Sequence, residues 1–286
     1  QKRMSVMSNN IPVFKMHDGY KIPAVGFGTS SVLGKSGAES VENALKNGYR
    51  LIDTAIRYEN EGAVGEGIRR SSVPREEVFV TSKLRGGLYD YDRALAAIEE
   101  SLFRTGLEYF DLFLLHWPNP KQDKYTEAWK ALIQAQKNGY VRSIGVSNFE
   151  PAHINRLIDE TSVKPAVNQI ELHPYFNQKE LREFNKEHDI ITESWSPLSR
   201  ARTVIYDETL KQLAENKNKE IAQVILRWHY QHGVLPIPKA SSSEHQQANL
   251  NIFDFELTEV EMQEIDSLTQ EEGRIDNQNP NEYEEF

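Results

Sequence analysis

Short apolar runs rich in β-branched residues alternate with amphipathic segments along almost the whole of the 286-residue chain. The runs lie at 24–28, 50–53, 78–83, 109–116, 141–147, 166–171, 190–195 and 234–237. The amphipathic segments between them include 40–47, 91–105, 125–138, 151–159 and 178–188. Because parallel strands cannot be joined by tight turns, this alternation is typical of parallel strands connected by crossover helices. The pattern predicts eight strand–helix units.

Eight units in about 250 residues, with no linker rich in Pro, Gly or Ser, favour a single barrel over two domains. A doubly wound dinucleotide-binding fold usually carries Gly-x-Gly-x-x-Gly after its first strand. The nearest match begins at Gly26 and lacks the third Gly, because Ser31 stands there. We therefore predict an α/β fold, a (β/α)8 TIM barrel formed by one domain over residues 11–286. Residues 1–10 are predicted to be a disordered extension.

Segments at the two ends of the chain complete this prediction. Residues 13–23 alternate apolar and polar around Asp18-Gly19, a strong hairpin signal, and we expect a β-hairpin that caps the bottom of the barrel. After the last strand, 243–250 and 258–268 have helical periodicity. Residues 270–286 are polar, acidic and weakly periodic, so we expect this tail to be partly mobile.

Composition excludes several classes of function. The chain has 33 Lys and Arg against 43 Asp and Glu, with no basic run, which makes nucleic-acid binding improbable. No run reaches the roughly 18 apolar residues of a membrane span. The absence of Cys removes disulfides, thiolate metal sites and a Cys nucleophile, and is compatible with a reducing compartment. We expect a cytoplasmic monomer whose partner is a small molecule.

Polar residues close the predicted strands, where a (β/α)8 barrel places its active site. They are Asp53, Lys83, His116, Ser147, Asn148, Gln169, Glu171, Trp195 and Lys239. Asp53, Lys83 and His116 are separated by 30 and 33 residues, about one unit each, so they should be neighbours on one rim. Tyr58 follows Asp53 by five residues and should lean over the same mouth.

These side chains suit proton transfer to a carbonyl oxygen. A phenol has an ordinary pKa of about 10, which a nearby ammonium lowers. We therefore expect Lys83 to make Tyr58 a usable general acid, with Asp53 holding Lys83. A neutral His116 can orient a substrate oxygen by donating a hydrogen bond. Without Cys or a metal cluster, the natural electron source is a nicotinamide hydride. No metal site is predicted.

Motifs in a fixed order between residues 13 and 268 resemble those of the aldo-keto reductase family, whose members are (β/α)8 barrels that reduce carbonyls with NAD(P)H. They are Gly26-Phe27-Gly28-Thr29, Asp53-Thr54-Ala55, Tyr58-Glu59-Asn60-Glu61, Thr81-Ser82-Lys83-Leu84, Asp111-Leu112, Leu115-His116-Trp117-Pro118, Gly145-Val146-Ser147-Asn148-Phe149, Asn168-Gln169-Ile170-Glu171-Leu172-His173-Pro174-Tyr175, Trp195-Ser196-Pro197-Leu198 and Ile237-Pro238-Lys239. The resemblance implies a reductase of small aldehydes, ketones or dicarbonyls that prefers NADPH and accepts NADH. The chain resembles small microbial members such as diketogluconate and glyoxal reductases.

The resemblance also implies roles for individual residues. Tyr58 is the expected proton donor, and Asp53, Lys83 and His116 complete a tetrad. The expected cofactor-binding residues are Gly28, Thr29, Ser147, Asn148, Gln169, Trp195, Ser196, Leu198, Lys239, Ser241, His245 and Asn249. The expected substrate pocket consists of Phe27, Arg57, Arg85 and Trp117.

Three positions depart from the family pattern. Ser30 and Arg85 stand where aromatic walls of the substrate pocket are common, and His245 stands where an arginine often binds the 2′-phosphate. Arg57 and Arg85 are either solvated rim charges or attract anionic substrates. Two other functions stay open on the sequence: a Schiff-base aldolase that uses Lys83 or Lys239, and a cofactor-bound barrel without turnover.

Overall fold

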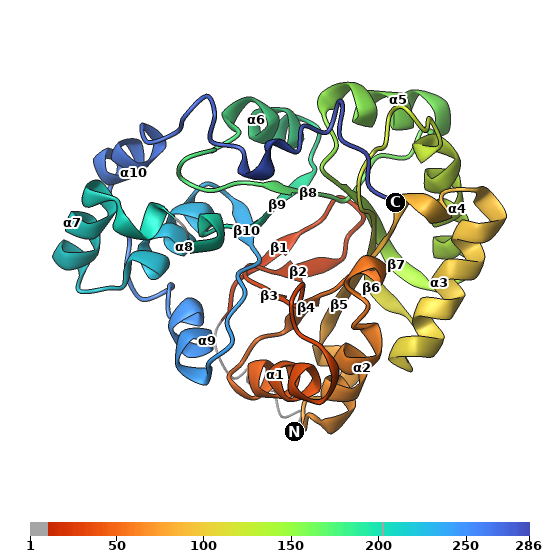
Figure 1. Ribbon diagram of the computed structural model, residues 1–286, viewed down its shortest axis with the longest axis horizontal. Coiled ribbons are helices and arrows are strands. Elements are labelled where there is room, and N and C mark those ends of the chain that lie inside the picture. The colour runs from red at the N-terminus through yellow and green to blue at the C-terminus, as the bar shows by residue number, and fades with distance from the viewer. Residues whose placement is uncertain (1–10, 202) are drawn as a thin grey trace.

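Eight parallel strands form one sheet surrounded by helices in the computed structural model, which describes residues 11–201 and 203–286 (Figure 1). The strands are neighbours in chain order, namely Phe27–Gly28 (β3), Leu51–Asp53 (β4), Phe79–Leu84 (β5), Phe110–Leu115 (β6), Val141–Ser147 (β7), Val167–Glu171 (β8), Ile191–Trp195 (β9) and Val234–Pro236 (β10). Backbone hydrogen bonds from Gly26 N to Pro236 O (3.1 Å) and from Gly28 N to Pro238 O (3.0 Å) join the two ends of this sheet. The predicted (β/α)8 barrel is confirmed. The extension predicted at residues 1–10 lies outside the described residues.

Helices connect the strands and form the outer layer of the barrel (Figure 1). They are Gly34–Lys46 (α1), Glu61–Arg70 (α2), Tyr91–Thr105 (α3), Tyr125–Lys137 (α4), Pro151–Thr161 (α5), Lys179–Glu187 (α6), Glu208–Lys217 (α7), Ile221–Gln231 (α8), Ser243–Leu250 (α9) and Glu259–Asp266 (α10). The sequence analysis did not name α2, which contains three glycines. A side chain at Gly65 or Gly67 would collide with Thr105 O or Ala38 O, so these glycines let α2 pack closely on its neighbours. Within the described residues, no helix is both long and apolar enough to cross a membrane.

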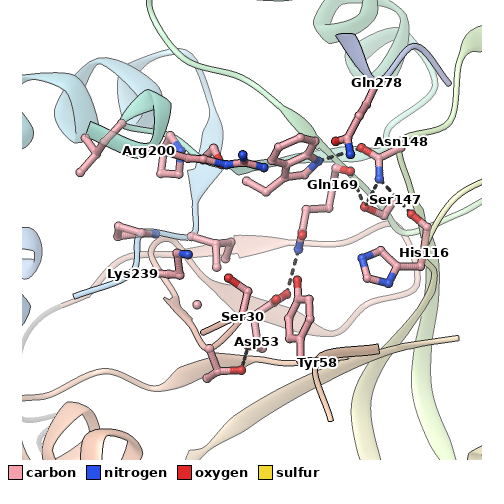
Figure 2. A pocket seen from close by; sticks show the side chains of 18 of the residues that line it. Ser30, Asp53, Tyr58, His116, Ser147, Asn148, Gln169, Arg200, Lys239 and Gln278 are labelled. Atoms are coloured by element: carbon pink, nitrogen blue, oxygen red, sulfur yellow. Dashed lines mark hydrogen bonds between the residues drawn. The ribbon is translucent and has the colours of Figure 1, made fainter. Parts of the chain in front are cut away.

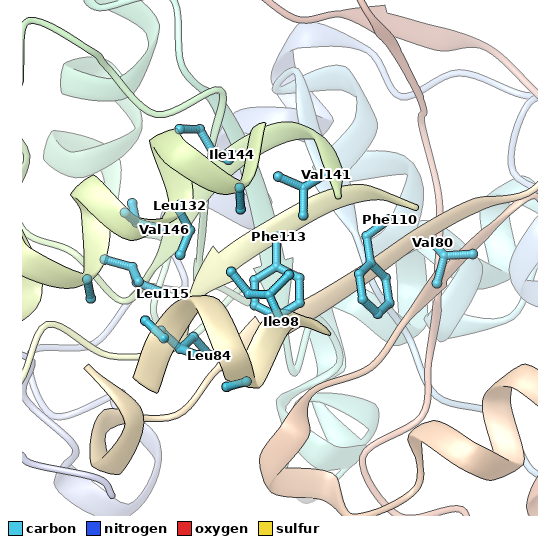
Figure 3. Packing of buried hydrophobic residues seen from close by; sticks show 14 of the residues in the cluster. Val80, Leu84, Ile98, Phe110, Phe113, Leu115, Leu132, Val141, Ile144 and Val146 are labelled. Atoms are coloured by element: carbon cyan, nitrogen blue, oxygen red, sulfur yellow. The ribbon is translucent and has the colours of Figure 1, made fainter. Parts of the chain in front are cut away.

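The hydrophobic core has two layers, separated by the sheet. Phe113 and Leu115 of β6 belong to the cluster between strands and helices, together with Ile98 of α3 (Figure 3). Leu112 and Leu114, which alternate with them along β6, belong to the cluster inside the barrel. Since successive side chains of a strand point to opposite faces, a nearly continuous apolar run is what a strand buried on both faces requires.

The predicted hairpin is present as β1 (Val13–Lys15) and β2 (Lys21–Pro23), an antiparallel pair. The Asp18 carboxylate accepts a hydrogen bond from Ser143 Oγ (2.6 Å), and His17 Nε2 lies 3.1 Å from Pro165 O. Ser143 lies near the amino end of β7, and Pro165 precedes β8. The hairpin therefore caps the end of the barrel opposite the carboxyl ends of the strands, as expected.

The tail after α10 lies across the carboxyl ends of the strands and runs from α10 past α6 towards α4 (Figure 1). Ile275 N donates to the buried Glu171 carboxylate (2.8 Å). Asn119 bonds both backbone groups of Glu285, at 3.1 and 2.7 Å. The tail that we expect to be partly mobile is an irregular segment with several polar contacts to the barrel. Polar contacts of this kind leave no periodicity in a sequence, so the pattern did not reveal them.

The closure of the barrel gives a first prediction. A Cβ atom at Gly26 would lie 2.7 Å from Ile237 Cδ1 and 2.8 Å from two Leu51 carbons, all in the packed interior. Gly26→Ala should therefore lower the free energy of unfolding by about 1–3 kcal/mol, as overpacking typically does. Gly62→Ala is the control, because its Cβ would meet only Arg104 O at 3.8 Å and Ala favours a helix. Equal effects of the two substitutions in urea denaturation would contradict this account.

Candidate active site

A cavity of about 490 Å³ lies at the carboxyl ends of the strands (Figure 2). Thirteen of the residues expected from the sequence line it: Gly28, Thr29, Asp53, Tyr58, His116, Trp117, Ser147, Asn148, Gln169, Trp195, Ser196, Leu198 and Lys239. Ser30, Pro197, Arg200, Ile237, Pro238, Gln278 and Glu285 line it as well. The polar strand ends therefore converge on one mouth, as their spacing predicted.

The Lys83 ammonium is completely buried beneath this cavity and is held by three oxygen atoms. Nζ lies 2.6 Å from Asp53 Oδ1, 3.0 Å from Thr54 O and 3.4 Å from Tyr58 Oη. Burial alone would lower the pKa of Lys83, but the charge of Asp53 and the contact with Tyr58 raise it above its ordinary value. Lys83 is thus a fixed cation in contact with the Tyr58 phenol.

Tyr58 follows β4 on a short 3-10 turn, Ile56–Tyr58, which carries its ring over the end of the strand. Burial raises the pKa of Tyr58, and Lys83 only partly offsets this effect. The expected lowering of this pKa is therefore wrong in its net direction, because the sequence gave no measure of burial. The result still suits a proton donor: the phenol keeps its proton at neutral pH, and Lys83 stabilises the phenolate that proton transfer leaves.

His116 stands beside Tyr58, with ring centroids 5.8 Å apart (Figure 2). Burial and the charges of Lys83, Arg57 and Arg85 lower the pKa of His116 well below its ordinary value, so the imidazole is neutral at pH 7. Its Nδ1 is buried and has no hydrogen-bond partner within the described residues. Since the His116 side chain lines the cavity, its neutral imidazole can form a hydrogen bond with a bound substrate oxygen.

A chain of hydrogen bonds continues from Asp53 into the barrel interior. Gln169 Nε2 lies 2.8 Å from Asp53 Oδ2 and 3.1 Å from Glu193 Oε2, as Figure 2 shows for the first contact. Burial and the charge of Asp53 raise the pKa of Glu193 to about 8, so it is mainly protonated at pH 7. The Asp53 carboxylate can only accept hydrogen bonds, so the amide nitrogen of Gln169 must face inward to donate to it. The amide oxygen of Gln169 is then available to a ligand in the cavity. The sequence analysis did not identify Glu193.

The upper wall of the cavity is fixed by Asn148, which lies just after β7 with a φ of 62°. Its Oδ1 accepts from Trp195 Nε1 (2.7 Å), and its Nδ2 donates to His116 O (2.9 Å). Ser147 Oγ donates to Gln169 O (2.7 Å). Asn148 therefore orients the Trp195 indole as well as facing the cavity.

The four residues expected in the substrate pocket lie in different parts of the structure. Trp117 lines the cavity, but Phe27 does not: it packs on Tyr49 in the core, with ring centroids 5.5 Å apart. Arg57 and Arg85 do not line the cavity either, and each donates to Phe286 O, at 2.8 and 2.7 Å. The two guanidinium groups hold the tail in place, which short-range sequence patterns could not reveal.

Three expected cofactor residues lie outside the cavity lining. Ser241 and His245 are exposed at the start of α9, and Asn249 is buried near its end. Arg200, which the sequence analysis did not name, lines the cavity together with Lys239 on the side away from His116 (Figure 2). Arg200 is paired with Asp276 of the tail (2.7 Å). Its place after Trp195-Ser196-Pro197-Leu198 was the one available signal.

His229 and His232 lie three residues apart at the carboxyl end of α8, a spacing that two metal ligands on a helix can have. His229 is buried and bonds Leu172 O, while His232 pairs with Asp266 (2.6 Å). Over residues 11–201 and 203–286, no group of three or more His, Cys, Asp or Glu is placed to hold a metal ion.

A (β/α)8 barrel with a Tyr–Lys–Asp–His cluster at its mouth defines a class of carbonyl oxidoreductases. The sequence profile of the Aldo/keto reductase family matches residues 24–270, and the chain belongs to this family. It is 48% identical to glyoxal reductase of Bacillus subtilis over 90% of this chain and 93% of that protein. It is 45% identical to 2,5-diketo-D-gluconic acid reductase B of a Corynebacterium species over 97% of this chain and 99% of that protein. The crystal structure of a Gox0644 variant in complex with NADPH matches with a TM-score of 0.92 and 43% identity, over 96% of this chain and 99% of that one.

The buried Glu193 gives a prediction about stability and pH. An unfolded chain releases this proton near the ordinary value of 4.5, whereas the folded chain keeps it to about pH 8. Between these values the folded state binds more protons, so this group makes stability fall as pH rises, by about 1.4 kcal/mol per pH unit. Glu193→Gln removes this dependence, and its stability relative to the parent should increase from pH 5 to 8 and then level off.

Urea denaturation at each pH measures this difference. The exposed Glu187→Gln is the control and should show no such slope. A difference between the Glu193 variant and the parent that does not change with pH would contradict the proposed protonation state.

Proposed function

We propose that this protein reduces small aldehydes, ketones and dicarbonyls to alcohols with NADPH, and that Tyr58 donates the proton. Membership of the Aldo/keto reductase family and the NADPH complex of a similar structure support the reaction and the cofactor. The single observation that carries the assignment of residues is the Lys83 ammonium, which lies 2.6 Å from Asp53 and 3.4 Å from the Tyr58 phenol. Glyoxal and diketogluconate reductases among the relatives support small carbonyl substrates.

The residues around the cavity fit the cofactor. Trp195, held by Asn148, offers an indole face for the nicotinamide ring, and Gln169 leaves its amide oxygen for the carboxamide. Lys239 and Arg200 place two cations at the far side, where phosphate groups would bind. When bound there, NADPH supplies the hydride that a carbonyl carbon accepts.

The protein's own groups manage the proton. Tyr58 holds it on Oη and releases it to the substrate oxygen as negative charge develops there. The Lys83 ammonium stabilises the resulting phenolate, and Asp53 holds the ammonium in position without removing its proton. His116, which is neutral, orients the substrate oxygen. Lys83, Asp53 and His116 are buried and Tyr58 is partly buried, which strengthens their electrostatic interactions.

The alternative functions lack support. A Schiff-base aldolase needs a neutral lysine amine, but the pKa of Lys83 is raised and its ammonium is paired with Asp53. Burial lowers the pKa of Lys239, but Lys239 lies on the side of the cavity away from His116. A barrel that binds the cofactor without catalysing a reaction would not need all four residues of the tetrad. In this structure the four lie together at the cavity. The monomeric state, the cytoplasmic location and the absence of nucleic-acid partners are parts of the proposal that rest on sequence composition.

Absorbance of the reduced nicotinamide, followed with NADPH and NADH over aldehydes, dicarbonyls and keto acids, tests the function itself. Tyr58→Phe tests the assignment of the proton donor. It should keep the dissociation constant of NADPH and lower kcat about 10²–10⁴-fold, the usual contribution of a general acid. Tyr49→Phe is the control: that phenol is also buried but bonds Gln246 O away from the cavity. A Tyr58 variant with near-normal kcat and rate-limiting chemistry would refute the assignment.

Cofactor preference gives another prediction, because His245 is exposed in the first turn of α9, the helix that follows Lys239. If His245 faces the 2′-phosphate, His245→Arg should tighten NADPH by about 1.5–3 kcal/mol through a charge-assisted contact and leave NADH nearly unchanged. Quenching of protein fluorescence gives both dissociation constants. Gln247→Arg is the control, because it adds the same charge at a position whose side chain contacts Asn47, the residue after α1. Equal effects of His245→Arg on both cofactors would place His245 away from the phosphate.

A further inference from the structure

Glu285 brings a carboxylate from the tail to the wall of the active-site cavity. Its Oε1 lies 3.1 Å from Arg57 Nε and 4.0 Å from His116 Nδ1. Its side chain is only 14% exposed, whereas that of Arg57 is 41% exposed. A negative charge therefore lies next to the imidazole that is proposed to orient the substrate oxygen.

The position of Glu285 is set by several independent contacts. Asn119 bonds both its backbone N and O, and Gly86 provides the space, since a Cβ there would lie 2.3 Å from Glu285 O. Tyr283 packs edge-on against Trp117, another cavity residue, with ring centroids 4.6 Å apart. On the outer side, the Glu284 carboxylate accepts from the backbone N of Lys121 and of Gln122. The carboxylate of Glu285 is therefore held in a fixed position in the wall of the active-site cavity.

The same contacts determine what charge a substrate meets. After Lys83, Arg57 and Arg85 are the cations whose charges lower the pKa of His116, and both would attract a substrate carboxylate. Both are instead bound to Phe286 O, and Arg57 is also paired with Glu285. A carbonyl compound that bears a carboxylate must then displace Glu285 from Arg57 or lie beside a second negative charge. A neutral substrate does neither.

We propose that Glu285 is a specificity-determining residue that makes this enzyme prefer neutral carbonyl compounds to carboxylate-bearing ones, by occupying Arg57 and placing its own charge beside His116. The inference rests on the proposed reduction of carbonyls. Family membership leaves the matter open, because the similar proteins include a reductase of the neutral glyoxal and one of an acid, 2,5-diketo-D-gluconic acid. Two unit charges about 6 Å apart near a protein surface repel enough to change a rate or an affinity about a hundredfold. Arg57 offsets part of the charge of Glu285, so we expect an effect nearer to tenfold.

The test uses two aldehydes of the same shape, 4-carboxybenzaldehyde and 4-formylbenzamide, with NADPH at pH 7 and constant ionic strength. The parent enzyme should show a kcat/KM at least about tenfold higher for the neutral amide. Glu285→Gln should bring the two values within about threefold, chiefly by raising that of the carboxylate. Arg57→Gln, which removes the cation and keeps Glu285, should shift the ratio in the opposite direction.

Glu284→Gln is the matched control, because it removes an equal charge from the same segment but on the outer side. It should keep the parental ratio. Equal kcat/KM values of the parent for the two aldehydes would overturn the inference. So would an equal gain on both aldehydes in Glu285→Gln, which would indicate steric obstruction, or the same change of ratio in Glu284→Gln. Failure of the parent to reduce either aldehyde or any other carbonyl would instead refute the proposed function, and this inference with it.

Discussion

The ion pair between Lys83 and Asp53 is the interaction on which the rest of the site depends. Removing an ammonium and a carboxylate from water is costly, and the attraction between them repays the cost only when the remaining hydrogen bonds are also made. Thr54 O and Tyr58 Oη complete the shell of the ammonium, and Gln169 bonds the second oxygen of Asp53. The barrel makes this possible because β4 and β5 are adjacent parallel strands, so their carboxyl ends carry Asp53 and Lys83 to one place. A fixed cation therefore lies in contact with the Tyr58 phenol.

Charge is distributed so that the catalytic end stays nearly neutral. Lys83 is balanced by Asp53, while the next interior carboxyl group, that of Glu193, is kept mainly protonated by burial and by the charge of Asp53. At the rim, the tail supplies Glu285 against Arg57 and Asp276 against Arg200. The tail therefore pairs with cations on two sides of the cavity.

The sequence predicted the barrel and the tetrad because both depend on regular spacing. Strands buried on both faces require apolar runs, and one polar residue per strand–helix unit places the polar groups on a common rim. Short-range patterns contain no information on burial, so they gave the wrong direction for the Tyr58 pKa and missed the neutral Glu193. The family resemblance placed Phe27 in the pocket, but its ring packs on Tyr49 in the core. The contacts of Arg57 and Arg85 with Phe286 join positions more than 200 residues apart, which periodicity cannot detect.

The central claim is that Lys83 acts through Tyr58, as one proton-donating unit. A double-mutant cycle on Lys83→Met and Tyr58→Phe tests it, with the single-turnover rate of NADPH oxidation measured at saturating cofactor in protein shown by cofactor binding to be folded. When two groups act as a unit, the losses of transition-state stabilisation caused by the two single substitutions do not add in the double variant. The account predicts that each single variant loses most of the rate and that the double variant is about as slow as the slower single one. Losses that multiply in the double variant would show that the two residues act independently and would contradict the account.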